Sequence, residues 1–322
     1  MDRRTLLTTN GLAIVMTALL VTGELKFVAA QSSPPANALK TVTIADGVVL
    51  HYAERGQGDP VVFVHGSLAD YSVWNRELAD FSAHYRAIAY SRRYNSPNTN
   101  AIRPGHSAIQ DADDLAAFIR TLNLGAVHIV GHSYGGLTAL FLATRHPELL
   151  QTLVLAEPPA IALLAQLPPN QATTGRATLA DIETRVGQMQ SAWRGGDLEE
   201  GMRIFFTWQT GNPAFWDRVL PEGVRQDSRR NFAEWDAVLM SGELFPSISA
   251  QAIQAIRAPV LVVSGVNTTP YLATIAEELT RLLQPRGAKH VVIPRASHVM
   301  FAQQPVATHD AIFDFLSKAI AR

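Results

Sequence analysis

The feature that most constrains the fold is an alternation of short apolar segments with longer segments of helical periodicity. The run Pro60–Val64 (PVVFV) is typical, because an unbroken apolar run of this kind indicates a strand buried on both faces. Strands that alternate with helices predict βα units and a mostly parallel sheet. The predicted strands span residues 41–44, 48–54, 60–64, 85–90, 126–130, 152–155, 259–264 and 289–293, and the predicted helices span residues 74–81, 109–124, 134–146, 271–283 and 306–320.

The alternation stops between residues 158 and 246, where no strand-like pattern occurs. Helical periodicity covers residues 179–193, 198–208 and 225–240. The same segment holds four of the chain's five tryptophans, namely Trp193, Trp208, Trp216 and Trp235. We therefore expect an α/β core over residues 41–157 and 251–322, interrupted by an all-helical cap over residues 158–250.

The N-terminal segment has the pattern of an export signal. Basic residues precede a mostly apolar stretch at residues 11–23, and small residues stand three and one positions before Gln31. This pattern predicts a signal peptide over residues 1–30, a linker over residues 31–40, and a periplasmic or secreted protein. Twin arginines near the start suggest twin-arginine export. A retained membrane anchor is the alternative, but the apolar stretch is short for a bilayer, so we expect no stable membrane insertion of the mature chain.

Composition excludes several classes of function. The chain has no cysteine, which rules out disulfides, thiolate zinc sites and a cysteine nucleophile. Lys and Arg total 27 and Asp and Glu total 28, a net charge of −1. A chain so close to neutral, without a basic run, is not expected to bind nucleic acid.

The strongest local motif is Gly131-His132-Ser133-Tyr134-Gly135, which follows an apolar strand and opens a helix. A serine hydroxyl becomes a nucleophile only when it projects clear of the backbone beside a base and an anion site. A tight strand-to-helix turn provides that exposure, and the glycines leave room for it. The alternative is a glycine-rich helix start in which Ser133 is only a capping residue.

Two further segments supply the parts that a serine nucleophile needs. The strand at residues 60–64 ends in His65-Gly66-Ser67, where the backbone N–H of Ser67, paired with that of Tyr134, would form an oxyanion hole. The base is expected after the last strand, and of ten histidines His298 alone is so placed. The function predicted from these parts needs neither a metal nor a cofactor.

With these motifs the chain resembles the α/β-hydrolase superfamily over residues 41–322. The resemblance rests on His65-Gly66, on the turn at residues 131–135 and on Ala296-Ser297-His298, in the order and at spacings similar to those of the family. It implies an eight-stranded sheet flanked by helices with a helical cap, Ser133 as the nucleophile and His298 as the base. It does not imply a substrate, because this fold supports many chemistries.

The acid of the triad departs from the commonest family pattern. The loop after the strand at residues 259–264 holds no carboxylate and offers only Asn267, a poor substitute because an amide cannot stabilise imidazolium. Glu157, at the end of the strand that neighbours the nucleophile's strand in this fold, is the better candidate. Some dehalogenases and lactone hydrolases of the superfamily place the acid there. The alternative is that Glu157 caps the entrance of the cap or pairs with an arginine.

These residues predict a serine hydrolase that cleaves a carbonyl-type bond, most simply an ester or a lactone, through an acyl-enzyme. A cofactor-free haloperoxidase-like activity, carbon–carbon hydrolysis, or a non-catalytic binding protein on the same fold are the alternatives. The tryptophan-rich cap suggests a small apolar or aromatic substrate. The candidate pocket residues are Leu68, Trp208, Trp216 and Met300.

Overall fold

The computed structural model describes residues 39–241 and 243–320. The predicted signal peptide and nearly all of the predicted linker lie outside these residues, and the first strand begins at Lys40. Eight strands form one sheet: β1 (Lys40–Thr43), β2 (Val49–Arg55), β3 (Pro60–Val64), β4 (Arg86–Tyr90), β5 (Val127–His132), β6 (Leu150–Ala156), β7 (Val260–Gly265) and β8 (Lys289–Ile293). Their order across the sheet is β1-β2-β4-β3-β5-β6-β7-β8.

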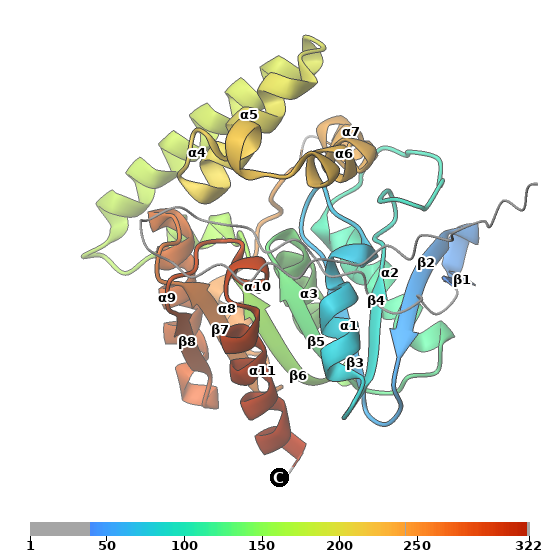
Figure 1. Ribbon diagram of the computed structural model, residues 1–322. Helices are drawn as coiled ribbons and strands as arrows, with labels where there is room; N and C mark the ends of the chain where they lie inside the picture. Colours follow the sequence, from blue (N-terminus) through green and yellow to red (C-terminus); the bar gives the residue numbers. More distant parts are fainter. Residues whose placement is uncertain (1–38, 242, 321–322) are drawn as a thin grey trace, which may run out of the picture.

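The strands from β4 to β8 pair in parallel, and β2 alone runs against the others, since it pairs antiparallel with both β1 and β4. The predicted eight-stranded, mostly parallel α/β fold is therefore confirmed. Helices cover both faces of the sheet (Figure 1). They are α1 (Asn75–Phe81), α2 (Ala108–Thr121), α3 (Tyr134–Arg145), α8 (Ala250–Gln254), α9 (Pro270–Leu283), α10 (Met300–Gln303) and α11 (Pro305–Ile320).

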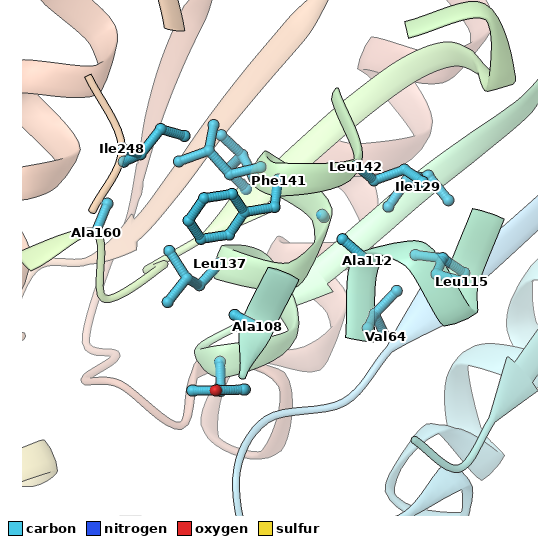
Figure 2. Packing of buried hydrophobic residues seen from close by; sticks show 14 of the residues in the cluster. Val64, Ala108, Ala112, Leu115, Ile129, Leu137, Phe141, Leu142, Ala160 and Ile248 are labelled. Carbon is cyan, nitrogen blue, oxygen red and sulfur yellow. The ribbon is translucent and has the colours of Figure 1, made fainter. Parts of the chain in front are cut away.

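Alternate side chains of the strands enter two separate cores. In β3, Val62 and Val64 pack with α2 and α3, whereas Val61 and Phe63 pack with α1 and α11. This is the two-residue period of a strand buried on both faces. Figure 2 shows the first core, where Leu137 and Phe141 of α3 lie in one cluster with side chains of α2.

The segment between β6 and β7 is helical, as the sequence predicts. It contains α4 (Ala172–Arg194), α5 (Leu198–Thr210), α6 (Glu222–Arg230) and α7 (Ala233–Ser241), which lie beyond one end of the sheet (Figure 1). We refer to residues 158–249 as the helical insertion. No helix within the described ranges is both long and apolar enough to cross a membrane.

One predicted helix of the insertion is wrong. Residues 225–240 do not form a single helix, because the chain breaks between α6 and α7. Asn231 lies at the break and turns its side chain toward the sheet domain. Its Nδ2 donates to a carboxylate oxygen of Asp70 at 3.2 Å, and its Oδ1 accepts from the N–H of Ser96 at 2.7 Å. These tertiary contacts leave no periodic signal in the sequence.

The C-terminal ends of the parallel strands bring distant segments of the chain together. Ser133 follows β5, Glu157 follows β6, and His298 lies five residues after the end of β8. On the other side, residues 65–68 follow β3. Ligand sites of open parallel sheets lie at this edge, so the topology places all the predicted site segments at one end of the sheet.

Candidate active site

Ser133 lies in a strained turn between β5 and α3. Its φ of 54° and ψ of −126° are unusual for a residue with a side chain, and such strain persists only where surrounding structure enforces it. The turn is enforced by close packing at Gly135, where a Cβ atom would lie 2.2 Å from the carbonyl oxygen of Val64. Only glycine fits there. The serine side chain is thereby fixed at the start of α3, next to the loop that follows β3.

Three side chains form a continuous hydrogen-bonded line. Ser133 Oγ lies 3.0 Å from Nε2 of His298, and Nδ1 of His298 lies 2.6 Å from Oε2 of Glu157. All three residues are buried, with Glu157 fully so. Because an ionised carboxylate only accepts hydrogen bonds, Nδ1 carries the proton, and Nε2 is left free to accept from the serine hydroxyl.

The carboxylate of Glu157 is held in its ionised form. Burial pushes its pKa upward, but the hydrogen bond and electrostatic attraction of His298 and the N–H of Gly265 together hold the pKa below its usual value. The N–H of Gly265 donates to Oε1 at 2.8 Å. Glu157 has a φ of 46°, a second strained residue at this edge of the sheet. The strained backbone and the bond from the end of β7 aim the carboxylate at His298.

Gly265 begins the loop in which the commonest family pattern places the acid of the triad. A Cβ atom at this position would lie 2.4 Å from the carbonyl oxygen of Ala296, in the loop that carries His298. The glycine therefore allows the end of β7 to touch the histidine loop while its N–H holds the acid. The side chain of the alternative residue, Asn267, is exposed, and its backbone N–H donates to the carbonyl of Ala296.

His132, next to Ser133, contacts both the backbone and the ring of His298. Its Nε2 lies 2.8 Å from the carbonyl oxygen of His298, and the two rings lie 4.8 Å apart. Burial, and secondarily the neighbouring His298, lower the pKa of His132 to about 4. His132 is therefore neutral at pH 7 and donates to the carbonyl through Nε2–H. This role was not predictable from the sequence, since nothing in the motif indicates that contact.

The loop after β3 lies directly against Ser133. A Cβ atom at Gly66 would be 3.0 Å from Cβ of Ser133. His65 fixes the loop from below, because its Nε2 accepts from the N–H of Arg92 at 3.0 Å while Nδ1 donates to the carbonyl of Gly66 at 2.8 Å. Burial, reinforced by the charge of Arg92, lowers the pKa of His65 and keeps it neutral. The loop that carries the Ser67 N–H is therefore rigidly held beside Ser133.

The four candidate pocket residues have different surroundings. Leu68 continues the loop after Ser67, with a φ of 57°. Trp208, near the end of α5, stacks on Tyr271 at the start of α9, with ring centroids 5.3 Å apart. Burial raises the pKa of Tyr271, and the nearby carboxylate of Glu157 raises it further. Leu68 thus belongs to the loop after β3, and Trp208 contacts Tyr271, the residue near Glu157.

Trp216 and Met300 belong to packing regions instead. The indole Nε1 of Trp216 donates to Glu199 at 2.9 Å, and its ring stacks on Phe206 within the helical insertion. Met300 is fully buried in the second core, the one that α1 and α11 cover. Trp216 thus packs within the helical insertion, and Met300 packs within the second core. Across the described ranges, no group of histidines and carboxylates could hold a metal ion.

Comparison with known proteins agrees with this architecture. A family model described as the alpha/beta hydrolase family matches residues 61–311. The putative carbamate hydrolase RutD of Pantoea ananatis is 34% identical over 110 residues, which cover 33% of this chain and 40% of that protein, so this match spans less than half of the relative. The 3-oxoadipate enol-lactonase 2 of Acinetobacter baylyi is 25% identical over 284 residues, which cover 85% of this chain and 95% of that protein.

Solved structures give the same result at the level of the fold. A thermophilic esterase from Thermogutta terrifontis matches with a TM-score of 0.67 and 21% identity over 88% of this chain and 99% of that one. The family model covers most of the chain, and the named relatives are hydrolases and lactonases. The resemblance drawn from the motifs is thus confirmed, and the chain is an enzyme of the alpha/beta hydrolase family.

Proposed function

We propose that the protein is a serine hydrolase that cleaves an ester or a lactone through an acyl-enzyme intermediate, with Ser133, His298 and Glu157 as its triad. The observation that carries the proposal is the line of hydrogen bonds from Glu157 through His298 to Ser133, all of it buried. This is the arrangement of nucleophile, base and orienting acid that activates a serine hydroxyl.

The proposed reaction begins when Oγ of Ser133 attacks the substrate carbonyl carbon and Nε2 of His298 takes the hydroxyl proton. Glu157 stabilises the imidazolium that results, and the N–H groups of Ser67 and Tyr134 hold the developing oxyanion. His298 then gives its proton to the leaving alkoxide as the carbon–oxygen bond breaks. In the second half, His298 takes a proton from water, the hydroxide attacks the acyl carbon, and Ser133 leaves with the proton from His298.

The proposed substrate class rests on two candidate pocket residues: Leu68, in the loop that contacts Ser133, and Trp208, which stacks on Tyr271 near Glu157. Leu68 and Trp208 present an aliphatic and an aromatic side chain, which favours a small apolar or aromatic substrate. The relative named as an enol-lactonase supports a lactone or ester carbonyl as the reacting group. Because both of these pocket side chains are uncharged, we propose an uncharged acyl group.

A hydrolysis screen tests the proposal. Purified protein should be assayed against p-nitrophenyl esters of increasing chain length, aromatic esters and lactones, with the Ser133→Ala variant as control. With an ester whose deacylation is slower than its acylation, we expect a burst of p-nitrophenol equal to the enzyme concentration, because acylation releases the alcohol first, and no burst in the variant. Hydrolysis that survives in the variant would contradict the nucleophile assignment. Peracid-dependent halogenation without ester or lactone hydrolysis would favour the haloperoxidase-like alternative.

A further inference from the structure

A cluster of buried charged and polar side chains lies where the helical insertion meets the sheet domain. We call it the junction cluster, and it consists of Arg92, Asn95, Asp111 and Glu234. Arg92 and Asn95 belong to the loop after β4, Asp111 to α2 and Glu234 to α7. Glu234 is 2% exposed, and Arg92 is 1% exposed. A charged group buried this deeply needs hydrogen-bonding or oppositely charged partners, so the contacts of Glu234 and Arg92 indicate their role.

The two carboxylate oxygens of Glu234 bind different partners, an arginine and the backbone of the loop after β3. Oε1 accepts from the guanidinium of Arg92. Oε2 accepts from the backbone N–H of Leu68 and from Nδ2 of Asn95, each at 3.0 Å. Leu68 directly follows Ser67 and has the strained φ of 57°. A side chain of the insertion thus fixes the peptide next to the proposed oxyanion donor.

Arg92 holds the same loop from its other end. Its Nε donates to the carbonyl of His65 at 3.3 Å, and Nη2 donates to the carbonyl of Gly66 at 3.1 Å. Its guanidinium also lies over the ring of Tyr134, 4.9 Å from the centroid. Arg92 is anchored by Asp111 at 2.7 Å. The Ser67 N–H therefore lies between a carbonyl held by Arg92 and an N–H held by Glu234.

We propose that Glu234 is a positioning residue for the oxyanion hole: through Leu68 N–H and Arg92, it orients the Ser67 amide toward the substrate carbonyl. The inference rests on the proposed function, because it assigns a role only if Ser133 attacks a carbonyl. Preorganised amides stabilise the transition state more than the bound substrate, and misplacing one donor costs mainly kcat. The helical insertion then contributes to catalysis through Glu234.

The structure offers a matched control within the same loop. Arg93, next to Arg92, forms a bidentate ion pair with Asp114 of α2, at 2.7 and 2.6 Å, and this pair is also largely buried. Asp114 accepts in addition from Gln110 of the same helix at 3.2 Å, so its carboxylate is not directed at residues 65–68. Removing the negative charge of Asp114 should lower stability about as much as removing that of Glu234, while residues 65–68 stay in place. Asp114→Asn thus separates a general loss of a buried ion pair from a loss of amide positioning.

The experiment compares Glu234→Gln, Glu234→Asp and Asp114→Asn with the wild-type enzyme on an ester from the screen. We expect Glu234→Gln to lower kcat by about 10–100-fold, within the cost of losing one oxyanion donor, with KM changed less than about threefold. A boronic acid that forms a tetrahedral adduct on Ser133 should bind more weakly by a similar factor. Glu234→Asp, which keeps the charge but cannot reach Leu68 and Arg92 together, should also lose kcat. Asp114→Asn should keep kcat and boronate affinity.

Each outcome bears on the inference. Equal losses in Glu234→Gln and Asp114→Asn at equal loss of thermal stability would show a merely structural role and overturn it, as would unchanged kcat in both Glu234 variants. If Glu234→Gln fails to fold, the Glu234→Asp kinetics and boronate binding decide. Fluorophosphonate labelling of Ser133 in the wild-type enzyme is measured first. If Ser133 is labelled but the Glu234 variants match the wild type, only this inference fails, whereas an unlabelled Ser133 means that the proposed function fails.

Discussion

Among single residues, Glu157 has the most informative position, because it provides a carboxylate from the strand next to the one that ends at Ser133. Its Oε2 faces Nδ1 of His298 at 2.6 Å, and the side chain of Asn267 is exposed. Glu157→Gln keeps the size of the side chain but removes the charge that stabilises imidazolium. We expect kcat to fall by about 10²–10⁴-fold with a small change in KM. Steady-state kinetics of this variant beside Asn267→Ala, expected to stay within about threefold of wild type, check the assignment.

His132 gives the enzyme a predictable dependence of stability on pH. Its pKa in the folded protein is about 4, below the ordinary 6.5, so the unfolded chain binds more protons between these values. The stability that neutral His132 contributes is complete above pH 6.5 and is lost as the pH falls toward 4. We expect the difference in unfolding free energy between wild type and His132→Gln to shrink by about 1–3 kcal/mol from pH 7 to pH 4.5. Urea unfolding at four pH values measures it, and a constant difference would contradict the assignment.

At the scale of elements, Gly265 at the end of β7 packs so closely against the loop that carries His298 that no side chain fits there. Gly265→Ala would place a Cβ atom 2.4 Å from the carbonyl oxygen of Ala296, so the loop carrying His298 must shift. We expect a loss of about 1–3 kcal/mol in unfolding free energy and a lower kcat. Gly187→Ala is the control, because Gly187 lies within α4 with open space around it. That change should stabilise the protein by up to about 1 kcal/mol. Thermal unfolding and kinetics of both variants provide the comparison, and a Gly265→Ala enzyme equal to wild type would show that the loop tolerates the added carbon.

The helices and strands also show which structural features a sequence pattern predicts and which it does not. The strands and the helices that flank them were predictable because burial on both faces imposes apolar runs and helical periodicity, as in β3 and α2. The break at Asn231 was not predictable, because it depends on bonds to Asp70 and Ser96 from distant loops. The contact of Glu234 with Leu68 was missed for the same reason. The adjacent Arg92 and Arg93, just after an apolar strand, were the one available signal of buried ion pairs.

At the scale of the whole molecule, the order of the strands explains why the site could be anticipated. Ser133, Glu157 and His298 are far apart in sequence, yet β5 to β8 are consecutive in the sheet and end at one edge. A chain with this βα order therefore brings residues after successive strands together. Packing inside the helical insertion follows no such rule, so the contacts of Trp216 with Glu199 and Phe206 could not be anticipated.

Export remains a prediction about the whole molecule. The signal-peptide pattern over residues 1–30 predicts a mature chain that begins at Gln31. Intact-mass measurement of the protein from the periplasmic fraction of an expressing bacterium should give the mass of residues 31–322. Full-length protein recovered only with the membrane would support the retained-anchor alternative.

The central claim is that Ser133 is an activated nucleophile, and active-site labelling tests this directly. The wild-type protein should react with a fluorophosphonate, gain the mass of one phosphonyl group, and carry it on Ser133 in peptide mapping. His298→Ala should slow the labelling by at least about 10²-fold, because the base that Nε2 provides is lost, and Ser133→Ala should abolish it. A wild-type protein that stays unlabelled, or one modified at another residue while Ser133 remains free, would contradict the claim.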